Sequence, residues 1–132
     1  MKSETVRPGP TGSPVLRVEE QGRYSVVVLT GEVDLATATD VRVCLRDLMV
    51  DGATHVLVDL RAVTFMDSTG LGVLVAARKQ ARVFRGSFGL VAPSPPVARV
   101  LSLTALDKFL PCFASVAEAS LADPTAELEP TA

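Results

Sequence analysis

The sequence predicts an α/β domain with a mixed, mostly parallel β-sheet and helices packed mainly on one face. Two observations predict this class. Short β-branched runs alternate with segments whose apolar residues keep helical spacing. The run at residues 54–60 is also almost wholly apolar, which is typical of a strand covered on both faces. The expected order is β-β-α-β-α-β-α-β-α, with right-handed crossovers between parallel strands.

The N-terminal third is expected to form a leader, a hairpin and a helix. Residues 1–14 are rich in Pro, Gly, Ser and Thr, which predicts a flexible leader. Residues 15–19 and 24–29 flank a turn and favour two antiparallel strands. Apolar residues from 35 to 49 keep helical spacing. Asp34 precedes them, and it is placed either to cap this helix or to lie with other loops at one end of the sheet.

A strand, a polar turn and a long helix form the centre of the predicted domain. The strand at 54–60 is followed by a short connection with a second apolar patch at 63–66, and then by Asp67-Ser68-Thr69-Gly70. Each of the first three side chains in this cluster has an oxygen that is able to cap a helix. The helix that follows has basic residues toward its end, which suits its dipole, and Gly86 closes it.

The C-terminal third is expected to add two strands and two helices. Pro111 argues against a central position for the second of these strands, because proline cannot donate to the ladder. The predicted elements are a buried strand at 88–91, a helix opened by the prolines of 93–96, an edge strand at 109–113 and a short helix capped by Ser115.

Composition limits the domain count and the classes of function. The chain has 132 residues and a formal net charge of −2, so we expect one domain at residues 15–122, a disordered tail at 123–132 and no nucleic-acid partner. We see no signal peptide and no apolar run near the roughly 18 residues of a membrane span, which predicts a soluble, cytoplasmic protein. Cys44 and Cys112 lack metal-ligand spacing and are interpreted as buried free thiols.

The candidate functional site is the helix start at Asp67-Ser68-Thr69. It presents a hydroxyl beside a carboxylate, where helix N–H groups are unpaired. On local chemistry alone, a plain capped helix is an equally good interpretation. Ser68 as a hydrolase nucleophile lacks a GxSxG elbow and a base, since the only histidine, His55, begins a strand and is interpreted as structural. Without a nucleotide or metal motif, we predict no cofactor and favour a binding module whose serine is modified by another protein.

Four stretches of sequence carry a family resemblance. They are Gly31-Glu32-Val33-Asp34, Val58-Asp59-Leu60, Phe65-Met66-Asp67-Ser68-Thr69-Gly70-Leu71-Gly72 and Ala105-Leu106-Asp107-Lys108-Phe109. Over about residues 15–121 the chain resembles the STAS family (sulfate transporter and anti-sigma factor antagonist), and in particular the stand-alone bacterial anti-anti-sigma factors. The Asp-Ser-Thr-Gly-Leu-Gly block is the most specific part of the match.

The resemblance implies a STAS-like fold and a partner-switching regulator that is not an enzyme. It implies that Ser68 is phosphorylated by a cognate anti-sigma factor, which is a serine kinase with a histidine-kinase-like ATPase fold. The unphosphorylated form would bind that kinase and free a sigma factor, and a metal-dependent serine phosphatase would restore it. The family also includes subunits that dock on transporter or lipid-transport ATPase complexes, which is the alternative function. The implied partner-binding residues are Asp34, Asp67, Ser68, Thr69, Gly70, Leu71 and Gly72. Thr69 carries the second hydroxyl and could be mistaken for the phosphate acceptor.

Overall fold

One mixed sheet runs through the computed structural model, which describes residues 4–7 and 15–122. Its six strands follow one another in sequence order across the sheet. β1, β2 and β3 pair antiparallel, whereas β3 to β6 pair parallel, which confirms the predicted mixed sheet. The strands are β1 (Glu4–Arg7), β2 (Val15–Gln21), β3 (Tyr24–Val33), β4 (His55–Met66), β5 (Ser87–Val91) and β6 (Cys112–Phe113).

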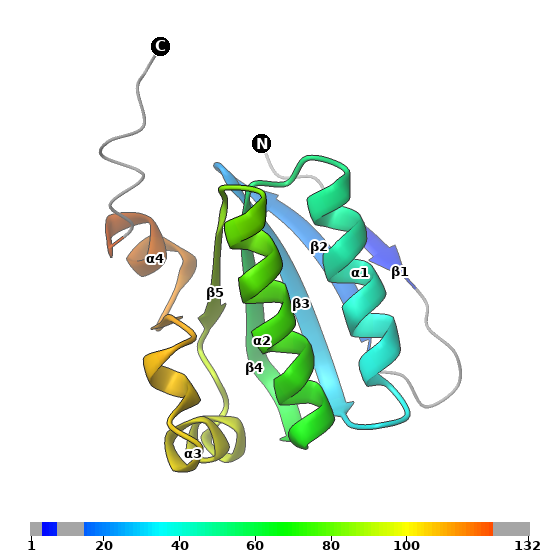
Figure 1. Ribbon diagram of the computed structural model, residues 1–132, viewed down its shortest axis with the longest axis vertical. Helices are drawn as coiled ribbons and strands as arrows, with labels where there is room; N and C mark the ends of the chain where they lie inside the picture. Colours follow the sequence, from blue (N-terminus) through cyan, green and yellow to red (C-terminus); the bar gives the residue numbers. More distant parts are fainter. Residues whose placement is uncertain (1–3, 8–14, 123–132) are drawn as a thin grey trace.

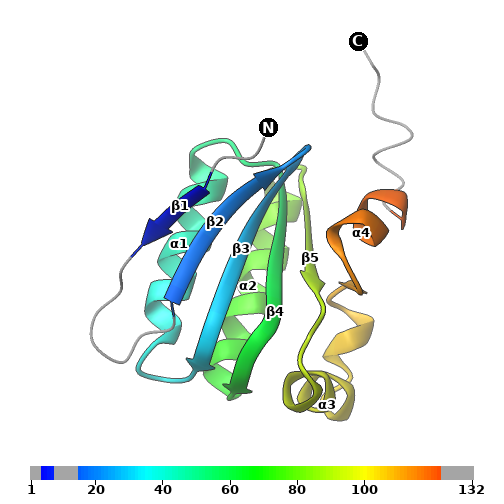
Figure 2. The same cartoon turned by 180° about the vertical axis from the view of Figure 1, so that it is seen from behind.

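The helices lie mainly on one face of this sheet, as predicted. α1 and α2 run side by side across that face (Figure 1), whereas the view from behind shows β2, β3 and β4 without a helix over them (Figure 2). α4 covers only the β5 side of the second face, where Ala119 packs with Tyr24 and Leu57. The helices are α1 (Ala38–Val50), α2 (Ser68–Val83), α3 (Pro95–Leu103), the 3-10 helix η1 (Leu106–Lys108) and α4 (Val116–Ala122).

The main core lies between the sheet and the two long helices. Alternate residues of β4, namely Val56, Val58 and Leu60, are buried together with Leu45 of α1 and Leu74 of α2. Burying one such side chain contributes about 1.5–3 kcal/mol, so this layer supplies most of the stabilisation of α1 and α2. It therefore holds both helices at fixed positions above the strand ends that carry the site.

The structure differs from the predicted flexible leader at Glu4–Arg7, which form the edge strand β1. β1 pairs antiparallel with β2, with Glu4 opposite Glu19 and Arg7 opposite Leu16. A strand edge offers unpaired N–H and C=O groups that a neighbouring segment can satisfy. Composition alone does not reveal such pairing, because it depends on an edge formed by a later part of the chain. The rest of the predicted leader and the predicted tail lie outside the described residues.

β3 and β4 both run further than predicted, and this brings the site together. The apolar patch at 63–66 belongs to β4, where Val63 pairs with Gly31 and Met66 with Val33. The prediction placed this patch in a connection because the strand pattern is interrupted, and the ladder does shift register twice along β3. The two strands end level with each other, so the loops that follow them meet (Figure 1).

α2 ends in a way that the sequence did not indicate. Gly86 donates its N–H to the Ala81 carbonyl (2.7 Å) and Arg85 donates to the Arg82 carbonyl (3.0 Å), which is the Schellman pattern. Arg85, with φ of 60°, occupies the left-handed position that the prediction gave to glycine. Gly86 is needed for a different reason, since a Cβ there would lie 1.9 Å from the Thr54 carbonyl oxygen.

The C-terminal elements follow the predicted order, with two corrections. β6 is an edge strand as predicted, but it spans only Cys112–Phe113. Cys44 is buried as predicted, whereas the same prediction is wrong for Cys112, which is exposed because the short edge strand turns it outward. Ser115 caps the last helix by accepting from the Glu118 N–H (3.0 Å). Among the described residues, none of the helices is long and apolar enough to span a membrane.

Candidate partner-binding site at the start of α2

The site forms where β3 and β4 end, and Asp67 joins its two loops. Asp67 is the N-cap of α2: Oδ1 accepts from the N–H groups of Thr69 (2.9 Å) and Gly70 (3.1 Å). Oδ2 accepts from the Leu35 N–H (3.1 Å), and the Asp67 N–H donates to the Val33 carbonyl (3.2 Å). One carboxylate thus caps the helix and holds the loop between β3 and α1 against it.

Of the two roles that the sequence left open, Asp34 takes the second, because the N-cap of α1 is Thr37 and Asp34 lies in the loop before it. Its Oδ1 accepts from the Ala36 N–H (3.0 Å) and from the Thr37 hydroxyl (3.1 Å), which fixes the turn before α1. Asp34 also lies in the loop that Asp67 binds through Leu35. α1 begins only at Ala38, so the helix predicted from residue 35 starts three residues later. The turn satisfies backbone groups that a longer helix would have paired itself.

Ser68 is the first residue of α2 and is exposed. Its hydroxyl makes no hydrogen bond to any residue within the described ranges 4–7 and 15–122. The N–H groups of Thr69 and Gly70 are occupied by Asp67, so these two are not the unpaired donors that we expected at the helix start. A group added to Ser68 would consequently point into solvent beside a carboxylate, and the helix backbone would not enclose it.

The predicted partner-binding residues divide into a surface set and a buried set. Ser68 and Gly72 are exposed, and Asp34, Asp67 and Thr69 are half-buried. The remaining two, Gly70 and Leu71, are buried and pack the helix start against the core.

Gly70 shows why this helix start tolerates no side chain on its inner face. A Cβ on Gly70 would meet the side chains of Met66 at 2.8 Å and Val33 at 2.9 Å. Gly72, in contrast, has open space around it. The first glycine therefore positions the site, while the second is available for contact.

Two exposed apolar side chains beside Ser68 were missed by the sequence analysis. Leu35 is 76% exposed and Phe65 is 48% exposed. The apolar spacing predicted Leu35 on the buried face of a helix, yet the true helix begins after Thr37. The signal that could have corrected this is Thr37 itself, since threonine directly before Ala38 is a favoured N-cap residue.

A hollow of about 310 Å³ continues this surface between α1 and α2. Arg42 is the one charged residue of its lining, and Thr69 and Gly72 connect the hollow to the helix start. The full lining is Leu35, Ala38, Thr39, Arg42, Thr69, Gly72, Val73 and Ala76. The small α2 residues leave room for side chains of a partner.

His55 lies too far from Ser68 to act as its base. His55 begins β4, whereas Ser68 follows the end of that strand, and the twelve residues of β4 span roughly 36 Å. His55 is buried, with Nδ1 2.8 Å from the Ser87 hydroxyl and its ring edge-on to Tyr24, which agrees with a structural role. The described part of the chain contains no cluster of three His, Cys, Asp or Glu side chains suited to a metal ion.

Comparison with known proteins identifies the family of this chain. The model of the STAS domain matches residues 15–119, which include the whole site. The chain belongs to the STAS domain family. The anti-sigma-F factor antagonist RsfB of Mycobacterium tuberculosis is 30% identical over 107 residues, covering 81% of this chain and 87% of RsfB.

Solved STAS structures show the same fold. An anti-sigma factor antagonist from Mycobacterium paratuberculosis has a TM-score of 0.73 and 31% identity, covering 91% of this chain and 93% of that one. The Bacillus protein SpoIIAA, an anti-sigma factor antagonist, has been solved unphosphorylated (TM-score 0.68, 26% identity, covering 79% and 91%) and phosphorylated (0.62, 25%, covering 79% and 95%). This STAS chain thus resembles regulators of sigma factors along most of its length.

Proposed function

We propose that this STAS protein is an anti-sigma factor antagonist whose binding is switched at Ser68. In the unphosphorylated form it binds an anti-sigma factor that is a serine kinase, and the sigma factor is thereby released. Phosphorylation of Ser68 ends the binding. The observation that carries the proposal is the exposed Ser68 hydroxyl, which has no hydrogen bond to the described residues and stands directly after the Asp67 cap.

The kinase is proposed to dock over the start of α2 and the neighbouring hollow. Leu35 follows the end of β3 and Phe65 lies near the end of β4, and both are large, exposed apolar side chains. Such side chains act as anchors when a partner covers them. Arg42 adds a positive charge inside the hollow. An apolar surface with one cation and two structural carboxylates favours a partner loop that is partly apolar and complementary in charge.

The proposed modification is a phosphoryl transfer onto an oxygen that is already accessible. The Ser68 oxygen forms a bond to the γ-phosphorus of ATP bound to the kinase, ADP leaves, and the hydroxyl proton passes to a base on the kinase. The phosphatase reverses this with water and releases inorganic phosphate. SpoIIAA, which shares the fold over 79% of this chain, exists in a phosphorylated form, and this supports the same chemistry here.

The electrostatics explain how one phosphate could change binding without unfolding the domain. Phosphorylation adds about −1.5 to −2 charges at pH 7. At the start of α2, the helix dipole favours that charge by about 0.3–1 kcal/mol, while the Asp67 carboxylate opposes it, so the fold is retained. At an interface, like charges brought together cost several kcal/mol, and about 3 kcal/mol lowers affinity roughly a hundredfold.

The proposal assigns no catalytic residue and no cofactor to this chain. Both chemical steps belong to the partners, which are the kinase and a serine phosphatase, and we propose that they meet the protein in the cytoplasm. Neither nucleic acid nor a membrane is needed for the binding step.

Phosphosite mapping by mass spectrometry tests the proposal. After incubation of the full chain with its cognate kinase and ATP, we expect phosphate on Ser68. Ser68→Ala should abolish it, whereas Thr69→Ala should leave it in place. Phosphate on Thr69 alone would show that Thr69, and not Ser68, is the acceptor. No phosphorylation at all, together with co-purification with a transporter ATPase complex, would favour the alternative docking function.

A further inference from the structure

We propose that the cavity between the C-terminal half of α2 and α4 binds a small organic anion with an apolar body. The cavity has a volume of about 530 Å³. It lies at the far end of α2 from Ser68, because Arg82 follows Ser68 by about 21 Å of helix. The site is therefore separate from the proposed switch.

The cavity exists because β6 is too short to cover the edge of β5. β6 pairs only with Leu90 and Val91, so Ser87, Phe88 and Gly89 have no strand beside them on that edge within the described chain. These residues line the cavity. Only these three residues of the β5 edge are unpaired with β6, and Pro111 closes one end of the cavity. Pairing with an extended peptide needs a longer edge, which favours a small molecule.

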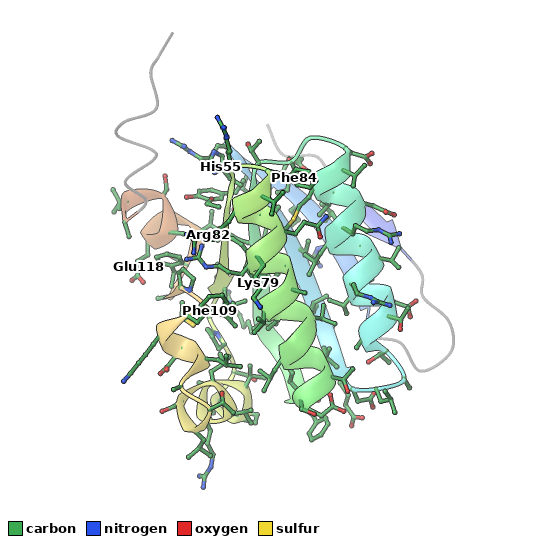
Figure 3. The ribbon with its side chains drawn as sticks, viewed as in Figure 1. His55, Lys79, Arg82, Phe84, Phe109 and Glu118 are labelled. Atoms are coloured by element: carbon green, nitrogen blue, oxygen red, sulfur yellow. The ribbon has the colours of Figure 1, made fainter. Side chains whose placement is uncertain are left out.

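Two guanidinium groups reach this cavity and none of its lining residues is acidic. Arg78 and Arg82 stand four residues apart on α2, so they project from the same side of the helix. In Figure 3, Arg82 extends from α2 toward the side on which α4 carries Glu118. That glutamate is engaged elsewhere, because its carboxylate accepts from the Ala114 N–H (2.9 Å). No ion pair joins Arg82 to a residue in the described ranges.

Arg78 is held in place and still has donors to offer. Its Nε donates to the Phe109 carbonyl (3.2 Å), and its guanidinium lies 5.6 Å from the centre of the Phe109 ring. A guanidinium has five N–H donors, so others remain for a ligand. The backbone adds one more donor, the N–H of Phe88. The N–H groups of Leu90 and Ala92 donate toward β6, and because alternate residues of a strand point their N–H groups to the same side, the Phe88 N–H faces that side too. Carboxylate, sulfonate or phosphate oxygens are the groups that such donors bind.

Apart from Ser87 and the Tyr24 hydroxyl, the other side chains of the lining are apolar and suit the body of such a ligand. Leu57, Phe88, Phe113 and Ala119 form the walls, and Tyr24 lies beneath α4 with its hydroxyl bonded to the Ala119 carbonyl (3.3 Å). A volume of 300–1,000 Å³ with apolar walls and a few convergent polar groups is typical of small-molecule sites. The ligand class is therefore an organic acid with an aromatic or aliphatic body.

A matched pair of fluorescent probes tests this site on the full chain. 8-Anilinonaphthalene-1-sulfonate has an apolar body with an anionic group, and N-phenyl-1-naphthylamine has the same body without it. We expect saturable one-to-one binding of the sulfonate. Arg82→Ala should raise its Kd about tenfold, whereas Lys79→Ala, which removes an exposed charge outside the lining, should change it by less than about twofold. The neutral probe should bind equally weakly to all three proteins.

Amide chemical shifts locate the probe. Shifts centred on Ser87 to Gly89 and Ala119 would support the site. Shifts centred on the exposed Val83 and Phe84 would overturn the proposed site. Equal losses of sulfonate affinity in Arg82→Ala and Lys79→Ala would also overturn it. Because Arg82 is exposed, its replacement should preserve the fold, which circular dichroism checks. Ser68→Asp should leave sulfonate binding unchanged, so failure here and failure of the proposed switch are distinguishable.

Discussion

Replacing Asp67 with alanine should destabilise the domain by about 2 kcal/mol. The loss has two parts. Removing the acceptor for the Thr69 and Gly70 N–H groups costs about 1 kcal/mol, the usual value for an N-cap. Removing the acceptor for the Leu35 N–H costs about 1 kcal/mol more, the middle of the usual range for a hydrogen bond. At about 4 °C per kcal/mol for a domain of this size, Tm should fall by roughly 8 °C.

Urea unfolding followed by circular dichroism measures this loss. Ser68→Ala is the matched control, since its hydroxyl has no bond to the described residues, and it should change the free energy of unfolding by less than about 0.5 kcal/mol. Asp67→Asn should lower the free energy of unfolding by about 1 kcal/mol, between the values for the other two variants. Its amide oxygen can still cap α2, while its amide nitrogen cannot accept from the Leu35 N–H. If Asp67→Ala cost no more than Ser68→Ala, the assigned role of Asp67 would be wrong.

Three further predictions concern neighbouring features. Gly72→Ala should stabilise the domain by about 0.5–1 kcal/mol in urea unfolding, because open space surrounds it in a helix, whereas Gly70→Ala should destabilise it through its contacts with buried side chains. Leu35→Ala should weaken binding of the cognate kinase roughly tenfold or more in calorimetric titration while leaving Tm unchanged, since the side chain is 76% exposed; unchanged binding would remove Leu35 from the interface. Cys112 is exposed at the surface, yet neighbouring atoms partly desolvate its thiol; this partial desolvation, with a smaller contribution from Asp107, raises the pKa of the thiol above 9.0, so its alkylation by iodoacetamide should be slower at pH 8 than that of an unfolded control. Because the folded pKa is raised, the stability that this thiol contributes is fully present below the unfolded pKa and is lost as pH rises from there through the folded pKa; alkylation as fast as the unfolded control would contradict the raised pKa.

The sheet and its helices were largely predictable because their signals are local. The β-branched run of β3, the apolar run of β4 and the helical spacing of α2 each lie within a short stretch of sequence. β1 was not predictable in this way, since its partner edge is created by β2. The role of Gly86 also depends on distance in sequence, because the atom that excludes a Cβ belongs to Thr54.

The candidate site was predictable in its polar part and not in its apolar part. Asp67 and Ser68 carry their roles in their own side-chain chemistry and in their position before a helix. Leu35 does not, because its exposure follows from a turn that Asp34 and Thr37 build and from a helix that starts later than its spacing indicated. Arg42 faces the hollow only because α1 and α2 pack side by side.

The most direct test of the central claim is the affinity of the full chain for its cognate anti-sigma kinase, measured by calorimetric titration with Ser68 unmodified and with Ser68 phosphorylated. The account predicts that phosphorylation raises Kd by roughly a hundredfold while the far-UV spectrum stays the same. Equal affinity of the two forms would contradict it.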